Sequence, residues 1–527
     1  MRAERAGMGG TTLPGLAAVI VAALASGPIV ATAPATASAP SAANHSTDAA
    51  MHQDVALGDA WAEVDESVNA PARALTSELD SNDKARVVTV KDVDGAPVIT
   101  SSAVRGRKQA TAVVEHEQAG QDTVAVAVQR KQHLLASQSN VLTLARASKT
   151  RAAKARAGNS RDPYIDSQWA LRTLEADSSW SVADGSGQTV AVIDTGVSRE
   201  PDVARNLLVG WDVIRGRSDG RNDQNGHGTH VAGVIAAEAN NGIGGAGLAP
   251  GAKILPVRAL DTNGNGFWSD VANGIVYAVN QGAGVINLSL GGDTDDPSLR
   301  AAINYALGNG RIVVAAVGND GTGAATYPAA YPGVIGVAAS DGADRVASFS
   351  NHGQAVDLAA PGVGILSTVP GDFASSSGTS MAAPFVSATA ALLRSAAVAR
   401  GLGHVDVQQA LRSSAVDVEA RGFDARSGAG RVSARGALCA VGACAFGLKA
   451  VVTMKKRKVI VRLNRDGVQR VVLQRKVGKK WKQVRVRMTA ATGVATFKVK
   501  KRAKPYRVVV PATNETSAAV KRPLKFR

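Results

Sequence analysis

The feature that most constrains the fold is an alternation of short apolar runs and helix-forming segments between residues 189 and 414. The apolar runs are rich in Val, Ile and Ala, as in TVAVID and RIVVAAV, and such runs are typical of strands buried on both faces of a parallel sheet. Alternation with helices predicts an α/β fold whose parallel sheet has helices on both faces. The expected strands lie near 189–194, 254–259, 285–290, 311–317, 334–338 and 356–359, and the expected helices near 228–238, 271–282, 297–309, 380–397 and 405–414.

The first 37 residues have the composition of an export signal. Arg2 and Arg5 precede the apolar run LAAVIVAAL, which is too short to span a bilayer, and small residues follow up to Ala37. The alternative is a short membrane anchor. Export predicts an extracellular protein, in which Cys439 and Cys444 would form a small disulfide loop.

The C-terminal region is strongly basic. Residues 447–527 contain 25 Lys or Arg against two acidic residues, so this region carries a net charge of +23 while the whole chain carries +17. Its apolar and polar residues alternate with period two, which predicts a small antiparallel β-sandwich. Such a surface would favour anionic cell-wall polymers or polysaccharides, the alternative being a merely solvated surface. No motif for specific nucleic-acid recognition is visible.

A serine stands at the start of one predicted helix. Ser380, in SGTSMAAP, precedes an apolar helix, so its hydroxyl would lie beside unpaired backbone N–H groups and the positive end of the helix dipole. A serine hydroxyl is a weak nucleophile until a base takes its proton. The alternative is that Ser380 only caps the helix.

Three other residues could complete a catalytic site with Ser380. His227 lies between two glycines in QNGHGTHVAG, and Asp194 ends a predicted buried strand, where α/β sheets place their ligands. Asn319, after the strand RIVVAAVG, could stabilise an oxyanion together with the Ser380 N–H. The alternatives are a metal pair of His227 with His230, which lacks a third ligand nearby, and a helix-capping role for Asp194.

Together these stretches resemble the subtilisin-like serine proteases, the subtilases of peptidase family S8. The matching motifs AVIDTGV, NGHGTHVAG, VVAAVGN and SGTSMAAP occur in the family's order, and the resemblance is strongest to the thermitase-like branch. It implies a subtilisin-like three-layer fold and a serine endopeptidase with an acyl-enzyme intermediate. By this resemblance Ser380 is the nucleophile, His227 the base, Asp194 its orienting carboxylate, and Asn319 an oxyanion donor.

The resemblance also implies where substrate binds. The family adds its substrate as a strand beside the segment that here reads Ser289, Leu290 and Gly291, which implies a broad sequence preference. Gly318 would line the primary pocket, and Asp320 at its rim would either favour basic residues or simply be solvated. The alternatives to a broad endopeptidase are a selective surface-processing protease and a wall-binding protein in which the protease domain is secondary.

One structural calcium ion, and no catalytic metal, is a further implication of the family. The ligands carried over are the side chains of Asp162, Asp202 and Asn241 and the carbonyls of Glu238, Ile243 and Gly245. Oxygen ligands from several loops suit calcium, and the alternative is a set of ordinary Asp and Asn turns.

A second calcium site of the thermitase-like branch is not expected here. Arg215 and Arg217 stand where acidic residues are expected in WDVIRGRSDGRNDQNG, and arginines would repel a cation. The second calcium is predicted to be absent, or replaced by an ion pair among Arg215, Arg217, Asp219 and Asp223.

The whole chain is expected to have four parts. These are a signal peptide (1–37), a prodomain with a basic linker (38–159), a catalytic domain (160–446) and a basic β-sandwich (447–527). The family resemblance implies an N-terminal prodomain, here a small α+β unit, and RVVTVKDVDG, QATAVVEHE and DTVAVAVQRK are predicted to be its strands. The basic linker that follows predicts maturation near Ser160. The expected product is a monomeric secreted protease acting on proteins or peptides.

Overall fold

The computed structural model describes most of the chain from residue 68 onward. The described residues are 68–120, 122–134, 138–142, 161–324, 326–443, 446–447, 450–455, 458–463, 470–477, 480–489, 494–498, 506–510, 516–517 and 519–520. The expected signal peptide, most of the basic linker and Cys444 lie outside them. The disulfide between Cys439 and Cys444 therefore stays a prediction.

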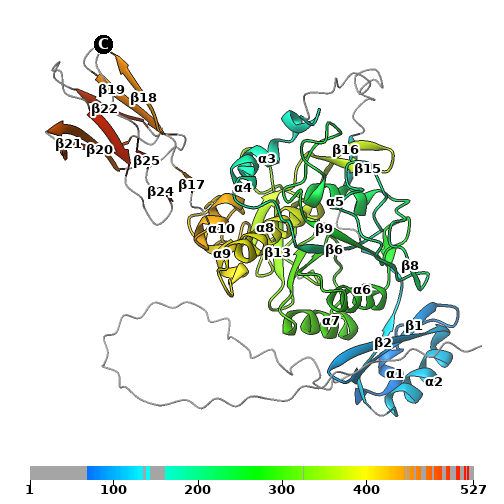
Figure 1. Ribbon diagram of the computed structural model, residues 1–527. Coiled ribbons are helices and arrows are strands. Elements are labelled where there is room, and N and C mark those ends of the chain that lie inside the picture. Colours follow the sequence, from blue (N-terminus) through cyan, green and yellow to red (C-terminus); the bar gives the residue numbers. More distant parts are fainter. Residues whose placement is uncertain are drawn as a thin grey trace, which may run out of the picture. The chain divides into compact units, whose positions relative to one another are not determined.

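An eight-stranded sheet forms the centre of the largest domain (Figure 1). Its strand order is β14-β13-β12-β11-β6-β9-β7-β8, and every neighbouring pair from β14 to β7 is parallel, while β8 is antiparallel to β7. The six predicted strands and the α/β fold class are confirmed. The bounds are β6 (Thr189–Asp194), β7 (Trp211–Asp212), β8 (Arg217–Ser218), β9 (Lys253–Arg258), β11 (Val285–Leu288), β12 (Ile312–Ala316), β13 (Ile335–Ser340) and β14 (Leu358–Pro361).

Helices cover both faces of this sheet, which gives the three layers that the family resemblance implies. Val190 and Val192 of β6 belong to the apolar core that contains α5 (His227–Ala236) and α8 (Thr379–Arg400). Ala191 and Ile193 point to the opposite face, as alternate strand residues must, and pack with α6 (Trp268–Asn280) and α7 (Pro297–Gly308).

Smaller elements complete this domain. A hairpin of β15 (Ile365–Val369) and β16 (Asp372–Ser377) leads directly into α8. The remaining helices are η4 (Ile165–Ser167), α3 (Trp169–Thr173), α4 (Ala176–Trp180), α9 (Val407–Ser413) and α10 (Ala434–Ala440). Among the described residues α8 is the one helix long and apolar enough to cross a membrane, but 89% of its most apolar window is buried, as in the core helix of a globular domain.

The region before the large domain is a small α+β unit. β1 (Lys84–Val93) is the central strand of an antiparallel sheet between β2 (Ala96–Arg105) and β3 (Thr123–Gln129). α1 (Ala72–Leu75) and α2 (Gly106–Gln118) pack on it. The prediction of a strand at QATAVVEHE was wrong, because Ala110 and Val114 are spaced for one face of a helix and are both buried in α2.

The basic C-terminal region consists of short strands, as predicted. One antiparallel sheet contains β18 (Ala450–Lys455), β19 (Lys458–Leu463) and β22 (Val494–Lys498). The other contains β20 (Arg470–Val477), β21 (Lys480–Met488), β23 (Tyr506–Val510) and β25 (Ala519–Val520). Alternating residues such as Val459, Val461 and Phe497 are buried, which confirms the period-two pattern. β17 (Phe446–Gly447) pairs with β24 (Thr516–Ser517).

Candidate active site

The predicted catalytic residues gather at one edge of the central sheet. β6, β11 and β12 are parallel neighbours, so Asp194 at the end of β6, Ser289 after β11 and Asn319 after β12 lie at the same carboxyl edge. Ser380 reaches this edge from α8. Its Oγ donates to the Ser289 carbonyl at 3.0 Å, and the Ser289 Oγ donates to the Ser380 carbonyl at 2.8 Å.

Asp194 and His227 form a buried hydrogen-bonded pair. The Nδ1 of His227 lies 2.8 and 2.9 Å from the two carboxylate oxygens of Asp194, which is fully buried. The Thr195 N–H donates to the same carboxylate at 2.7 Å and fixes its orientation. Burial opposes protonation of the ring, but the charge and hydrogen bond of Asp194 outweigh it and raise the pKa of His227 above its ordinary value.

Asp223 fixes the backbone that presents His227. Its carboxylate accepts from the Gly226 N–H at 2.8 Å, from the Thr229 N–H at 2.9 Å, and from the Thr195 hydroxyl at 2.9 Å. The prediction that Asp223 belongs to an arginine cluster was therefore wrong. The DQNGHGT spacing, in which an Asp precedes the N-terminus of a helix, is the signal that could have identified this capping role.

The second ring nitrogen of His227, Nε2, is buried and makes no hydrogen bond within the described part of the chain. The Ser380 hydroxyl instead donates to Ser289, so the base–nucleophile bond is not formed in this structure. Such bonds often form only when substrate is present.

His230 has a different role from His227. It is buried, and its Nε2 lies 2.9 and 3.2 Å from the carbonyl oxygens of Ile365 and Ala374. Burial lowers the pKa of His230 to about 4, so the ring is a neutral link between α5 and the β15–β16 hairpin. Over the described ranges no three His, Cys, Asp or Glu side chains are arranged to hold a metal.

The Asn319 side chain is oriented by Thr379, the residue before Ser380. Its Oδ1 accepts from the Thr379 N–H at 2.8 Å and from the Thr379 hydroxyl at 3.1 Å. With the oxygen held toward Thr379, the amide nitrogen is directed away from it. Gly318 has a φ of 101°, and its N–H also donates to the Thr379 hydroxyl at 3.2 Å.

The predicted substrate-binding segment already pairs with a strand from the N-terminal unit. The Gly291 N–H donates to the carbonyl of Leu134 at 2.8 Å, and the Leu134 N–H donates to Gly264 at 3.0 Å. Just before it, β4 (Gln132–His133) pairs antiparallel with β10 (Asn265–Gly266). Residues 132–134 therefore lie as an extended segment between residues 264–266 and residues 289–291. Of these two flanking segments, the sequence predicts only 289–291.

The Leu134 side chain fills a closed apolar position. It is fully buried, in one core with Trp268 and Leu290. A Cβ at Gly266 or Gly292 would lie 3.5 or 3.4 Å from its methyl groups, which is ordinary van der Waals contact, so both glycines line the position that the side chain fills. Further along, β5 (Gln138–Leu142) pairs with β16, placing Gln138 opposite Ser377, three residues before the nucleophile candidate.

Comparison with known proteins agrees with this geometry. The sequence model described as the Subtilase family matches residues 185–430. Thermitase from Thermoactinomyces vulgaris is 47% identical over 264 residues, which are 50% of this chain and 93% of thermitase. Subtilisin Savinase from Lederbergia lenta is 44% identical over 228 residues, which are 43% of this chain and 83% of that protein. The chain belongs to the subtilase family. As a subtilase, it is a subtilisin-like serine endopeptidase.

The residues expected to bind calcium in this subtilase lie together. The carboxylate of Asp162 accepts from the N–H groups of Asn240 and Gly242 at 2.7 and 3.0 Å, and Asp202 accepts from the Asn241 amide at 2.9 Å. Both aspartates are buried. Burial is the largest cause that raises the pKa of both, that of Asp202 to about 7, and each also lies near the negative charge of Glu238.

This electrostatic environment fits a bound cation. Two buried carboxylates close to each other are stabilised as anions by a divalent ion. The Asn241 amide now donates its nitrogen to Asp202 and accepts from the Ile243 N–H at 2.7 Å, so it would turn to offer its oxygen to an ion. Glu238 points elsewhere with its side chain, which pairs with Arg205 at 2.9 Å, so it can contribute only its carbonyl. The positive φ angles of Asn240 and Gly242 (61° and 78°) give the tight turn that brings the loop onto Asp162.

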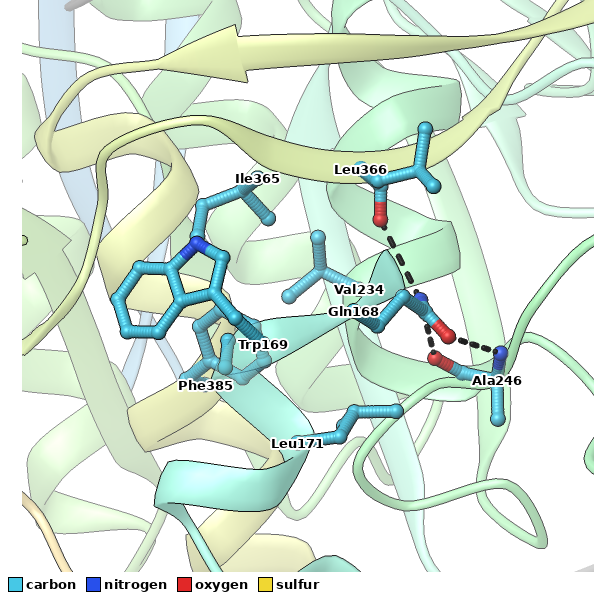
Figure 2. Close-up of a pocket in the computed structure, with 9 residues that line it drawn as sticks. Gln168, Trp169, Leu171, Val234, Ala246, Ile365, Leu366 and Phe385 are labelled. Carbon is cyan, nitrogen blue, oxygen red and sulfur yellow. Dashed lines mark hydrogen bonds between the residues drawn. The ribbon is translucent and has the colours of Figure 1, made fainter. Parts of the chain in front are cut away.

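A small pocket lies beside this loop (Figure 2). Gln168 crosses it and links two segments, since its amide nitrogen donates to the carbonyl of Ala246 at 2.9 Å and to that of Leu366 at 3.3 Å, while its oxygen accepts from the Ala246 N–H at 2.8 Å. The cavity volume is about 10 Å³. The pocket is therefore a packing junction and too small for substrate.

The arginine-rich loop of the subtilase domain forms ion pairs, but with other partners than predicted. Asp212 is buried and pairs with Arg258 at 3.3 Å and with Arg215 at 3.6 Å. Asp219 pairs with Arg221 at 2.8 Å. Asp212 thus already has two positively charged neighbours, which disfavours a cation there.

Proposed function

We propose that this subtilase is a secreted endopeptidase that is made as a zymogen and hydrolyses peptide bonds through Asp194, His227 and Ser380. The observation that carries the proposal is the buried Asp194–His227 pair at the sheet edge where Ser380 meets Ser289. The raised pKa of His227 supports a base that can hold a proton during the reaction.

The reaction follows from these positions. The Ser380 hydroxyl attacks the peptide carbonyl while His227 Nε2 takes its proton, and Asp194 holds the Nδ1 proton and stabilises the charged ring. The Asn319 amide and the Ser380 N–H stabilise the oxyanion. His227 then gives the proton to the leaving amine, and water hydrolyses the acyl-enzyme in the reverse sequence of proton transfers.

Substrate would bind as the strand between residues 264–266 and 289–291. Main-chain hydrogen bonds supply most of the recognition in this mode, so a broad sequence preference is expected. Gly318 would line the pocket for the residue before the cut bond, with Asp320 at the rim. Leu134 now occupies part of this path, which supports an inhibitory role for the N-terminal unit.

The N-terminal unit makes further contacts that support a prodomain role. Arg86 pairs with the buried Asp270 at 2.7 Å and lies over the ring of Phe267. The buried Gln129 accepts from the Ser269 N–H at 3.1 Å, and so caps α6, which has no side-chain cap of its own. The unit thereby stabilises the start of a helix in the catalytic domain.

The pairing on both sides of Ser380 bears on maturation. Leu134 pairs with Gly264 and Gly291, and Gln138 lies opposite Ser377, so described residues of the N-terminal unit pair with two segments beside the candidate site. We expect maturation by a cut near Ser160, at the end of the basic linker.

Two accessory properties complete the proposal. One structural calcium ion would be held by Asp162, Asp202 and Asn241 with the carbonyls of Glu238, Ile243 and Gly245, and it would tie separate loops together without taking part in the reaction. Residues 447–527, with a net charge of +23, would retain the secreted enzyme on anionic cell-wall polymers or polysaccharides.

The test compares the full-length chain with its Ser380→Ala variant. We expect the wild type to cleave itself and to hydrolyse casein, while the variant stays full-length and inactive with an unchanged melting temperature. Self-cleavage and casein hydrolysis by the variant at wild-type rates would refute the proposed nucleophile.

A further inference from the structure

Asn351 is a buried amide that contacts the oxyanion loop at several points. It lies between β13 and β14, and its side chain is directed at the segment after β12. Its Oδ1 accepts from the backbone N–H groups of Asp320 and Thr322 at 2.9 and 3.2 Å, and its Nδ2 donates to the Thr326 hydroxyl at 3.2 Å. Its own N–H donates to the Gly318 carbonyl at 3.0 Å.

These contacts bracket Asn319. The carbonyl before Asn319, on Gly318, and the N–H after it, on Asp320, are both bonded to Asn351. The loop belongs to no helix or strand, so hydrogen bonds from other segments must set its position. Thr379 holds the Asn319 side chain, while Asn351 holds the backbone on both sides of it.

The packing of this contact requires the residues found there. Gly318 has a φ of 101°, and a Cβ on it would lie 2.4 Å from the Asn351 Nδ2. The amide therefore occupies the space that a side chain at 318 would need. The absence of a Cβ at Gly318 thus allows the Asn351 amide to lie close to the backbone that precedes Asn319.

We propose that Asn351 is a positioning residue for the oxyanion hole, acting through the backbone of Asn319. The inference rests on the proposed role of Asn319 as oxyanion donor. A donor stabilises the transition state only when it is held at hydrogen-bond distance from the oxygen that becomes charged. A displacement of about 1 Å can cost roughly 100-fold in rate, and Asn351 prevents such a displacement.

The Asn351→Ala variant is expected to fold. Asp320 and Thr322 are exposed residues, so water can replace the lost acceptor at their N–H groups. Backbone bonds from Gly321 to Phe349 at 2.8 Å and from His352 to Thr322 at 2.9 Å remain and keep the loop in place approximately. The melting temperature of each variant is measured to verify folding.

A double-mutant cycle with Asn319 tests the proposal. We expect Asn319→Ala to lower kcat on a peptide anilide by about 10² to 10³-fold. Asn351→Ala alone should lower kcat by about 10-fold or more with KM changed less than about threefold, because ground-state binding does not use the oxyanion donor. In the Asn319→Ala background the same substitution should have almost no further effect.

Thr326→Val is the matched control. It removes the partner of the Asn351 Nδ2 but leaves the Oδ1 bonds to the loop, so kcat should stay close to that of the wild type. An additive cycle, or wild-type kcat in Asn351→Ala, would overturn the positioning role while leaving the proposed function intact. Unchanged kcat in Asn319→Ala alone would instead refute the oxyanion role on which the inference rests.

Discussion

The Asp194→Asn substitution tests the chemistry of the site with little change in shape. The Thr195 N–H donates to Oδ1 of Asp194, so the oxygen of an introduced amide must take that position. The amide nitrogen then takes the position of Oδ2, 2.9 Å from Nδ1 of His227, while the amide oxygen stays at the position of Oδ1, 2.8 Å from it. The introduced donor favours the tautomer in which Nδ1 is the acceptor and the ring proton is on Nε2.

This tautomer cannot accept the proton of Ser380. We expect kcat to fall by about 10⁴-fold, the loss typical of a triad with the wrong tautomer, which corresponds to about 5.5 kcal/mol of transition-state stabilisation. The Thr195 bond and the volume of the side chain are kept, so the melting temperature should change little.

The pH profile gives a second readout. The wild type should lose activity as the pH falls through the pKa of His227, which lies above the ordinary 6.5 because of Asp194. Without that negative charge, burial dominates and lowers the pKa, so the acidic limb of kcat/KM should move to lower pH. Activity within about tenfold of the wild type, or an acidic limb that does not move, would refute the reasoning.

Three further outcomes are expected. Chelation of calcium should lower the melting temperature of the wild type by roughly 10 °C, since an ion at a thousand times its Kd stabilises the fold by about 4 kcal/mol. The melting temperature of Asp202→Asn should not respond to the chelator. Equal chelator sensitivity of both proteins would contradict the assigned ligands. Leu134→Asp should slow self-cleavage by at least about tenfold, because it buries a charge in an apolar position. The control Lys131→Gln loses only an exposed ion pair with Asp261 and should change the rate less than about twofold. Equal rates of self-cleavage for the two variants would argue against docking through Leu134. Removal of residues 447–527 should abolish retention on an anionic resin at low salt without altering peptide hydrolysis, and retention that persists in high salt would exclude an electrostatic role.

The sequence predicts the catalytic domain well because its signals are local. Buried parallel strands such as TVAVID are recognisable as continuous apolar runs. Because the strands are parallel, the residues that follow them lie at the same edge of the sheet. The strand predicted at 109–117 is part of the helix at 106–118, because short Ala- and Val-rich segments fit both periods.

The contacts that the sequence did not reveal are long-range. Asp212 pairs with Arg258, which is 46 residues away, and the segment at 264–266 binds a segment from the N-terminal unit. Strand β13 and its connections separate Asn319 from Asn351 along the chain, so no local sequence pattern predicts that the two residues lie close together. Such pairings depend on how the elements pack, which local patterns do not specify.

The most direct test of the central claim is labelling of the active serine. An organophosphonate that reacts only with an activated serine is added to the mature enzyme, and the modified peptide is identified by mass spectrometry. The account predicts a single adduct on Ser380 that disappears in the His227→Ala variant. An adduct on another serine, or labelling of Ser380 that persists without His227, would contradict it.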